Sequence, residues 1–192
     1  MRNDPFDKTQ DHAERSRIHE KFIYLFALVL FLFLLPRIVF AQSSYVLPYP
    51  SSMPGSLAYK FHLIYETLSK YWYFGDFGQF DYNLKMTDKY LVEAKTLFEY
   101  KQFLLGHKAL QKSNFYFKNI LPFLEVAKSK NKNIVKKRAI FKEASLKYVE
   151  VLERLKREVP GIFVWKPEKS SPTTLYLQRT IENSVLLREK DL

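Results

Sequence analysis

The strongest cluster of chemically competent side chains in the sequence is a run of cations between residues 128 and 142. No Asp or Glu lies between Glu125 and Glu143. Part of the run falls in the first turns of a predicted helix, where positive charge opposes the helix dipole by about 0.3–1 kcal/mol per residue. The placement slightly favours contact with an anionic polymer, such as a wall polyanion, lipid head groups or nucleic acid, although a solvated basic loop is the commoner explanation of such a run. The run comprises Lys128, Lys130, Lys132, Lys136, Lys137, Arg138 and Lys142.

Two short motifs imitate catalytic signatures without their supporting residues. Asp76-Phe77-Gly78 spells the magnesium-holding triplet of protein kinases, but neither a Gly-rich phosphate loop nor a catalytic-loop motif accompanies it. Ser129 and Lys132 have the Ser-x-x-Lys spacing of penicillin-interacting enzymes, whose other motifs are missing as well. We therefore predict no catalytic residues and a protein that is not an enzyme.

Metal-ligating residues are sparse. The chain has no cysteine, which excludes thiolate metal sites and thiol catalysis. Its four histidines are His12, His19, His62 and His107, and none has another histidine three or four residues later. The sequence predicts neither a metal site nor a cofactor, and places His62 and His107 at the surface or the core edge.

The segment that positions the rest of the chain is residues 22–41, whose first fourteen residues are apolar or aromatic. It has the length and the ending of a signal peptide cleaved near Ala41, because Pro36 precedes small and β-branched residues. A retained membrane anchor is the alternative, and it must carry Arg37 near one edge. In both interpretations the charged leader, residues 1–21, stays in the cytoplasm, and the remainder is extracytoplasmic, secreted or membrane-anchored.

The composition of the remainder suits one basic helical domain. The whole chain holds 31 Lys/Arg and 20 Asp/Glu, of which six and five lie in residues 1–41. The exported part therefore carries an excess of ten cations. Hydrophobic residues make up 47% of the chain and glycine only five residues, which favours helices with a real core over a turn-rich β fold.

The periodicity predicts an all-α fold, an antiparallel bundle of about four main helices with a weaker C-terminal helix. A Pro-rich strap, residues 42–55, precedes the bundle domain, residues 56–160. We interpret the strap as a tether lying on its own domain, with a peptide ligand for an aromatic groove as the alternative. The predicted helices cover residues 56–74, 80–101, 103–128 (kinked or split at Pro122) and 134–159 (capped by Asn133).

The first predicted helix carries a one-sided apolar stripe of Leu57, Phe61, Ile64, Leu68 and Tyr71. Ser56 is its predicted cap, and Gly75 and Gly78 are predicted to stop it. It ends in an aromatic cluster, residues 71–74. Core packing is the preferred interpretation of this cluster, and a belt at a lipid interface or a ligand surface are alternatives.

The C-terminal extension, residues 161–192, begins with an apolar run at 162–165 that we predict to be extended. A loop follows, and Ser171-Pro172 has the form of a helix start. The last predicted helix covers residues 173–189, with Leu177, Ile181 and Val185 as its better stripe. It is expected either to dock on the bundle or to bind a partner.

The strap and first two helices carry a resemblance to a known family. The segments are Tyr45-Val-Leu-Pro-Tyr-Pro50, Met53-Pro-Gly-Ser-Leu-Ala-Tyr-Lys60 and Leu91-Val-Glu-Ala94. They resemble a bacterial domain-of-unknown-function family with a Leu-Pro-Tyr-Pro entry motif after a signal or anchor segment. The chain departs from it at residues 74–79, where the family has a Pro-containing turn. The resemblance implies an exported or anchored helical domain and supplies no functional residue.

These observations together predict an exported or membrane-anchored envelope protein, a binding or scaffold domain without catalysis. A basic-surface binder of an anionic polymer is one alternative. The block Glu93-Ala-Lys95 with Leu104-Leu-Gly-His-Lys-Ala109 gives another, a tetratricopeptide-like interaction domain. The expected partners are the membrane through residues 22–41, an envelope protein, or an anionic polymer.

Overall fold

The computed structural model describes residues 43–50, 54–55 and 57–190. The predicted leader, the apolar segment and the predicted cap Ser56 lie outside these residues. The chain divides into two units, Met1–Ala41 and Gln42–Leu192, and the fold below is that of the second unit. Within the described ranges, no helix combines the length and apolar character needed to cross a membrane.

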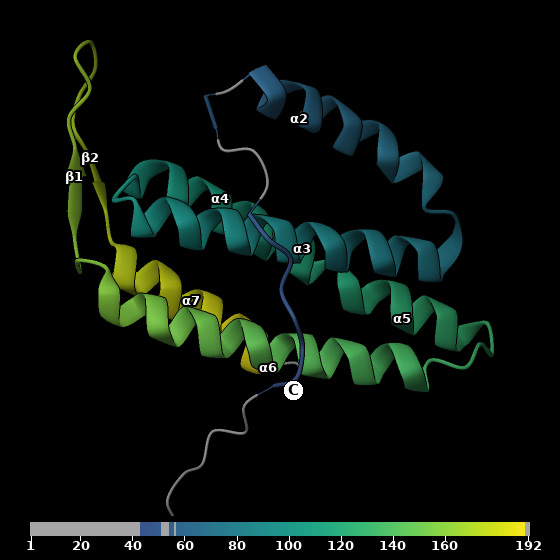
Figure 1. The fold of residues 1–192 in the computed structure, drawn as a ribbon. Coiled ribbons are helices and arrows are strands. Elements are labelled where there is room, and N and C mark those ends of the chain that lie inside the picture. The colour runs from purple at the N-terminus through teal and green to yellow at the C-terminus, as the bar shows by residue number, and fades with distance from the viewer. Residues whose placement is uncertain (1–42, 51–53, 56, 191–192) are drawn as a thin grey trace, which may run out of the picture. The chain divides into compact units, whose positions relative to one another are not determined.

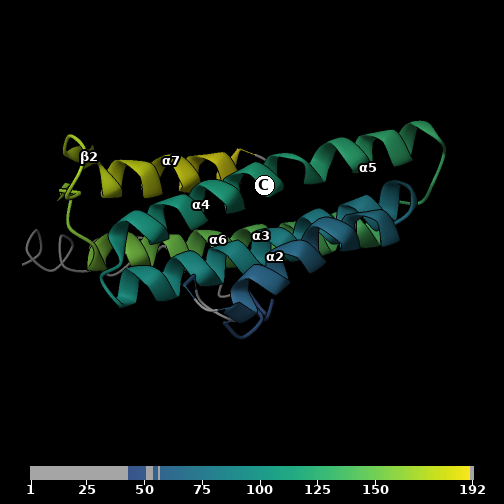
Figure 2. The same ribbon diagram turned by 90° about the horizontal axis from the view of Figure 1, so that it is seen from above.

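The described part is largely helical, as predicted, with one two-stranded sheet. Successive helices alternate in direction along the unit, except that α5 continues in the direction of α4 (Figures 1 and 2). The elements are α2 (Leu57–Ser69), the 3-10 helix η1 (Lys70–Trp72), α3 (Gly75–Glu99), α4 (Phe103–Lys118), α5 (Ile120–Ser129), α6 (Val135–Glu158), β1 (Phe163–Trp165), β2 (Thr173–Leu175) and α7 (Leu177–Glu189).

Helix α3 is the centre of the bundle. It packs against α4, α5 and α6, while α7 packs against α6 and α4 (Figure 2). The core forms where these helices meet, through side chains that are at most 1% exposed, including Leu91, Leu110, Ile120, Leu124 and Leu152. Helix α3 has 25 residues and α4 has 16. Two such helices together are longer than the 34 residues of a tetratricopeptide repeat, and the tetratricopeptide-like alternative stays a prediction.

The predicted split of the third helix is confirmed. Helix α4 ends at Lys118, Asn119 separates the two helices, and α5 begins at Ile120. Pro122 then lies in the first turn of α5. A proline is tolerated there because its missing N–H would have no partner within the helix. Asn133 also acts as predicted, because its Oδ1 accepts a hydrogen bond from the Val135 N–H at 3.1 Å.

Two glycines shape the turn before α3, in a way the sequence only partly indicated. Gly75 has a φ of +69°, a conformation that residues with a Cβ rarely adopt, and it begins α3. Gly78 lies inside α3 instead of stopping a helix. A Cβ at Gly78 would lie 2.7 Å from the backbone carbon of Tyr73, so the close return of the chain requires glycine there.

The described part of the strap lies on its own domain, as predicted. Tyr45 and Leu47 pack against the core. The Ser43 hydroxyl donates a hydrogen bond to the Glu143 backbone oxygen on α6 at 2.7 Å, and the Tyr45 hydroxyl donates to Asp88 on α3 at 2.8 Å. The strap therefore crosses from α6 to α3 before the chain reaches α2 (Figure 1).

Helix α2 is the element whose packing differs most from the prediction that its apolar side belongs to the core. Its predicted apolar stripe lies on one side of the helix but faces away from the bundle: Leu57 is 74% exposed and Tyr71 71%. The buried residues of α2 are Glu66 and Ser69. In the aromatic cluster Trp72 and Phe74 are also exposed, so core packing is wrong for them. The polar side of α2 faces α3 because tyrosines and a lysine of α3 satisfy it, as described below.

The C-terminal extension contains a hairpin that the sequence did not predict. The expected extended run is strand β1, and it pairs antiparallel with β2, with Val164 opposite Thr174. The predicted helix start at Thr173 is wrong, because residues 173–175 form β2 and α7 begins at Leu177. Helix α7 docks on the bundle through the predicted stripe of Leu177, Ile181 and Val185.

Candidate functional site

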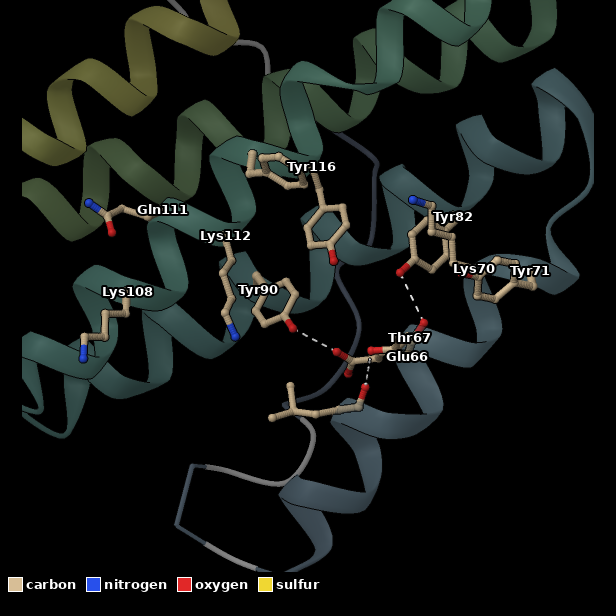
Figure 3. Close-up of a pocket in the computed structure, with 12 residues that line it drawn as sticks. Glu66, Thr67, Lys70, Tyr71, Tyr82, Tyr90, Lys108, Gln111, Lys112 and Tyr116 are labelled. Atoms are coloured by element: carbon tan, nitrogen blue, oxygen red, sulfur yellow. Dashed lines mark hydrogen bonds between the residues drawn. The ribbon is translucent and has the colours of Figure 1, made fainter.

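A pocket of about 720 Å³ lies where α2, α3 and α4 meet (Figure 3). Helix α2 and η1 supply one wall, which includes Glu66 and Tyr71, and α4 supplies the opposite wall. Two tyrosines of α3, Tyr82 and Tyr90, contribute to its floor. They belong to a second apolar face of α3, separate from the main core, which also includes Met86.

Glu66 is the central polar group of this pocket. Its carboxylate accepts a hydrogen bond from the Tyr90 hydroxyl at 2.9 Å and forms an ion pair with Lys89. Its backbone oxygen accepts a hydrogen bond from the Tyr82 hydroxyl at 3.2 Å. Nearby, the Tyr59 hydroxyl donates to Glu93 at 3.0 Å, a second polar bond from α2 to α3. These bonds hold the polar side of α2 against α3 and leave its apolar side outward.

The floor is built of aromatic rings in contact with one another. Tyr90 and Tyr116 are stacked, with ring centroids 5.7 Å apart and planes 3° apart. Tyr82 meets Tyr116 edge to face at 6.0 Å, and Phe115 meets Tyr116 in the same way at 5.3 Å. The ammonium group of Lys112 lies 4.9 Å from the centroid of Tyr90. The arrangement gives a flat, polarisable surface beside a cation.

Tyr82 and Tyr90 of the floor remain protonated donors. Burial, followed by the charge of Glu66, raises the pKa of Tyr90 well above its usual range. Burial also raises the pKa of Tyr82, with Tyr116 and Glu66 adding to the effect. Burial also raises the pKa of the neighbouring carboxyl group of Glu93. The hydrogen bond from Tyr59 and the charges of Lys89 and Lys112 lower it and so act in the opposite direction. Hydroxyls in such surroundings donate hydrogen bonds and are poorly suited to act as bases or nucleophiles near neutral pH.

The predicted basic run does not lie at this pocket, and four of its seven cations have acidic partners. Lys130 and Lys132 bracket Asp76 at 2.9 and 2.8 Å. Lys137 pairs with Asp81 at 2.5 Å. These bonds fasten the loop between α5 and α6 to the start of α3. The fourth pair joins Arg138 and Glu125 at 3.7 Å.

Three members of the run, Lys128, Lys136 and Lys142, have no ion pair among the described residues. Binding of an anionic polymer through the run therefore stays a prediction, with fewer available cations than the sequence indicated. The kinase-like triplet has a structural explanation as well. Hydrogen bonds from Lys132 and Lys130 lower the pKa of Asp76, which keeps its carboxylate charged as the acceptor of the loop.

A second buried polar cluster joins the strap to the core. Asp88 of α3 accepts hydrogen bonds from the Tyr148 hydroxyl at 2.6 Å and from the Tyr45 hydroxyl at 2.8 Å. Burial raises the pKa of Asp88 to about 6, although both tyrosine bonds favour the charged form. Because the two tyrosine hydroxyls occupy both carboxylate oxygens, the cluster has a structural role.

Arg188 of α7 is 0% exposed and has no carboxylate in ion-pair contact within the described part of the chain. It donates to Asn114 at 2.7 Å and to Ser113 at 3.0 Å, both on α4. Its guanidinium lies 5.0 Å from the ring centre of Phe117 and 5.6 Å from that of Tyr148. Burial lowers the pKa of Arg188 to about 10, so it remains a cation at neutral pH.

The histidines behave as expected from their isolation in the sequence. His62 is exposed, and His107 lies at the core edge, where its Nε2 is 3.0 Å from Gln111. Burial lowers the pKa of His107. In the described residues no group of three or more His, Cys, Asp or Glu side chains is placed to hold a metal ion.

The sequence contained one signal for this pocket that we did not use. Tyr82, Met86 and Tyr90 recur every four residues on a side of α3 different from that of Phe80, Leu84 and Leu91. A helix with apolar residues on two sides needs neighbours on both. Glu66, by contrast, could not be distinguished by sequence from a solvated glutamate.

Comparisons with protein-family models, curated proteins and solved structures found no match to this chain. The resemblance to a bacterial family through the Leu-Pro-Tyr-Pro motif therefore stays a prediction. The functional argument depends on the geometry of the chain itself.

Proposed function

We propose that this chain is a non-enzymatic scaffold domain of the bacterial envelope, exported or anchored through residues 22–41, which associates with a second copy of itself. The contact surface is the outward face of α2, η1 and the residue pair that follows η1. The observation that carries the proposal is the exposure of large apolar side chains there, each at least 53% exposed. They are Leu57, Phe61, Ile64, Tyr65, Leu68, Tyr71, Trp72 and Phe74.

The size of this face supports a second copy as its occupant. Soluble monomers rarely expose contiguous apolar patches above about 300–600 Å². Eight such side chains, at roughly 100 Å² each, offer about 800 Å², the area that each partner of a stable complex commonly buries. The 13-residue helix α2 is about 20 Å long. Two such helices can cover each other along their length.

The chemistry of the face also fits self-association. In a two-fold contact the same surface meets itself, so charged side chains in the patch would face like charges. The stripe of α2 carries none: Lys60 and Lys70 lie outside it on the helix. A non-enzymatic role is supported by the candidate pocket, where the hydroxyl of Tyr90 and the carboxylate of Glu66 are committed to each other and to Lys89.

The absence of cysteine allows a direct test by crosslinking. We would introduce one cysteine at Ile64, in the middle of the stripe, and in a matched variant one at Val135, which is 74% exposed on α6. Under mild oxidation Ile64→Cys should form a disulfide-linked dimer and Val135→Cys should not. Adding Phe61→Asp and Leu68→Asp should prevent crosslinking at position 64. Equal crosslinking of both variants, or none for Ile64→Cys, would overturn the proposal.

A further inference from the structure

The pocket between α2, α3 and α4 has a surplus of positive charge at its edge. Lys70 at the start of η1, and Lys108 and Lys112 one turn apart on α4, line it and are exposed. None of the three has an ion pair among the described residues. Gln111, between the two lysines in sequence, adds an exposed amide to the same wall. The lysines of the basic run that pair with Asp76 and Asp81 are, by contrast, already bound to carboxylates.

The negative charge in the pocket is already compensated. Glu66 is the acidic residue of the lining, and its carboxylate is bound by Lys89 and by the Tyr90 hydroxyl. Lys89 does not line the pocket, so its charge offsets Glu66 from behind the wall. Lys89 also lies 4.0 Å from Glu93, so it is shared by two carboxylates. Within the lining an anion meets three lysines and a single carboxylate, that of Glu66.

The aromatic side chains of the pocket can recognise the shape of a ligand in addition to its charge. Tyr71, Phe115 and Tyr116 line the pocket along with the α3 tyrosines. Phe115 is 62% exposed although it contacts Tyr116, so its ring has a free side. Aromatic faces bind flat or ring-shaped groups by stacking, and lysine ammonium groups bind phosphate as point charges.

We infer that this pocket binds a small organic anion that carries a phosphate on a ring. Lys108 and Lys112, which lie together on the α4 side of the pocket (Figure 3), would hold the phosphate, and the rings of Phe115 and Tyr116 would lie against the ring of the ligand.

The proposal does not depend on self-association, because Leu63, Glu66 and Thr67 of the pocket lie on a different side of α2 from Phe61 and Leu68. Tyr71 of η1 borders both surfaces, and the variants below leave it unchanged.

Phenyl phosphate is a suitable probe, with inorganic phosphate and phenol as its two halves. Titration calorimetry on the full-length protein should show binding of phenyl phosphate at least tenfold tighter than that of either half. Lys108→Met with Lys112→Met should weaken it by at least tenfold, since the variant removes the two charged donors proposed to contact the phosphate. Lys136→Met with Lys142→Met, which removes two unpaired cations of α6, is the matched control and should change affinity less than twofold.

Phe115→Ser separates ring recognition from charge attraction. Because Phe115 is exposed, the variant should fold, and it should weaken phenyl phosphate by about fivefold while leaving inorganic phosphate unchanged. Three results would overturn the proposal: no binding of phenyl phosphate at millimolar concentration, equal binding of phosphate and phenyl phosphate, or equal weakening by the α4 and α6 lysine variants. Sugar phosphates and vesicles containing a phosphorylated-sugar lipid would then distinguish a soluble ligand from a head group.

Discussion

The two sides of α3 are held in opposite ways. Toward α4, α5 and α6 it presents Phe80, Leu91 and Leu97, each at most 2% exposed. Toward α2 it presents Lys89, Tyr90 and Glu93, which bind Glu66 and Tyr59 through hydrogen bonds and ion pairs. The first side excludes water from a core. The second holds a helix by a few polar bonds while the apolar stripe of that helix stays in solvent.

The difference shows that an amphipathic helix need not direct its apolar side inward. Burial of an apolar side chain contributes about 1.5–3 kcal/mol, whereas a net hydrogen bond contributes about 0.5–1.5 kcal/mol. Helix α2 should therefore be the least stable part of the described bundle, and it should open before α3 and α6 do. The outward stripe remains available for the second copy.

The largest expected effect comes from the apolar side. Leu110→Ala removes a side chain that is 0% exposed and should lower the free energy of unfolding by about 3–4 kcal/mol. Leu68→Ala, at a position 53% exposed on α2, should change it by less than about 0.5 kcal/mol. Urea denaturation at concentrations where the chain is monomeric measures both. Similar losses in the two variants would show that α2 is part of the core.

The next largest effect comes from Asp88, a carboxyl group buried on α3 away from α2. Its pKa is about 6 in the folded state and about 3.9 unfolded, so the folded state holds its proton more tightly. Stability from this group is complete below about pH 4 and is lost as the pH rises through 6, a change on the order of 2–3 kcal/mol. Asp88→Asn removes the group that titrates. The difference in unfolding free energy between wild type and variant should fall from pH 4 to pH 7, and a flat difference would contradict this assignment.

A smaller and local effect is expected on the polar side. Glu66→Ala leaves Lys89 and the Tyr90 hydroxyl without their main acceptor and should destabilise α2 by about 1–2 kcal/mol. Hydrogen exchange of α2 amides should accelerate by roughly tenfold, with α3 and α6 amides little changed. Glu99→Ala, which breaks the exposed Lys95–Glu99 pair at 2.9 Å, should have almost no effect. Acceleration throughout the bundle would show that α2 and the core unfold together.

The sequence predicted the helices well where a single stripe faced a single core. The start of α6, the break at Pro122 and the docking stripe of α7 were confirmed for local reasons: a cap, a missing N–H and a regular spacing. It failed at α2 because periodicity shows that a stripe exists and not which side meets the bundle. The partners of Glu66 lie more than 20 residues away, at Lys89 and Tyr90.

The remaining errors have the same origin in distant contacts. Strand β2 was predicted as helix because Ser171-Pro172 has the form of a helix start, and only pairing with β1 shows otherwise. The ion pairs of the basic run were missed because Asp76 and Asp81 lie more than 50 residues before the lysines that bind them. Local patterns in the sequence identify helices. Which lysine pairs with which aspartate depends on the tertiary fold, which brings distant segments together.

The burial of Arg188 near the C-terminal end of α7 means that the bundle can be completed only late in translation. Phe117 and Tyr148, the two rings beneath its guanidinium, leave the ribosome well before position 188 does. Until α7 arrives, Ser113 and Asn114 lack the donor that satisfies them in the finished protein. A nascent chain stopped within α7 should therefore be a substrate for chaperones and proteases, and its last turn closes the bundle.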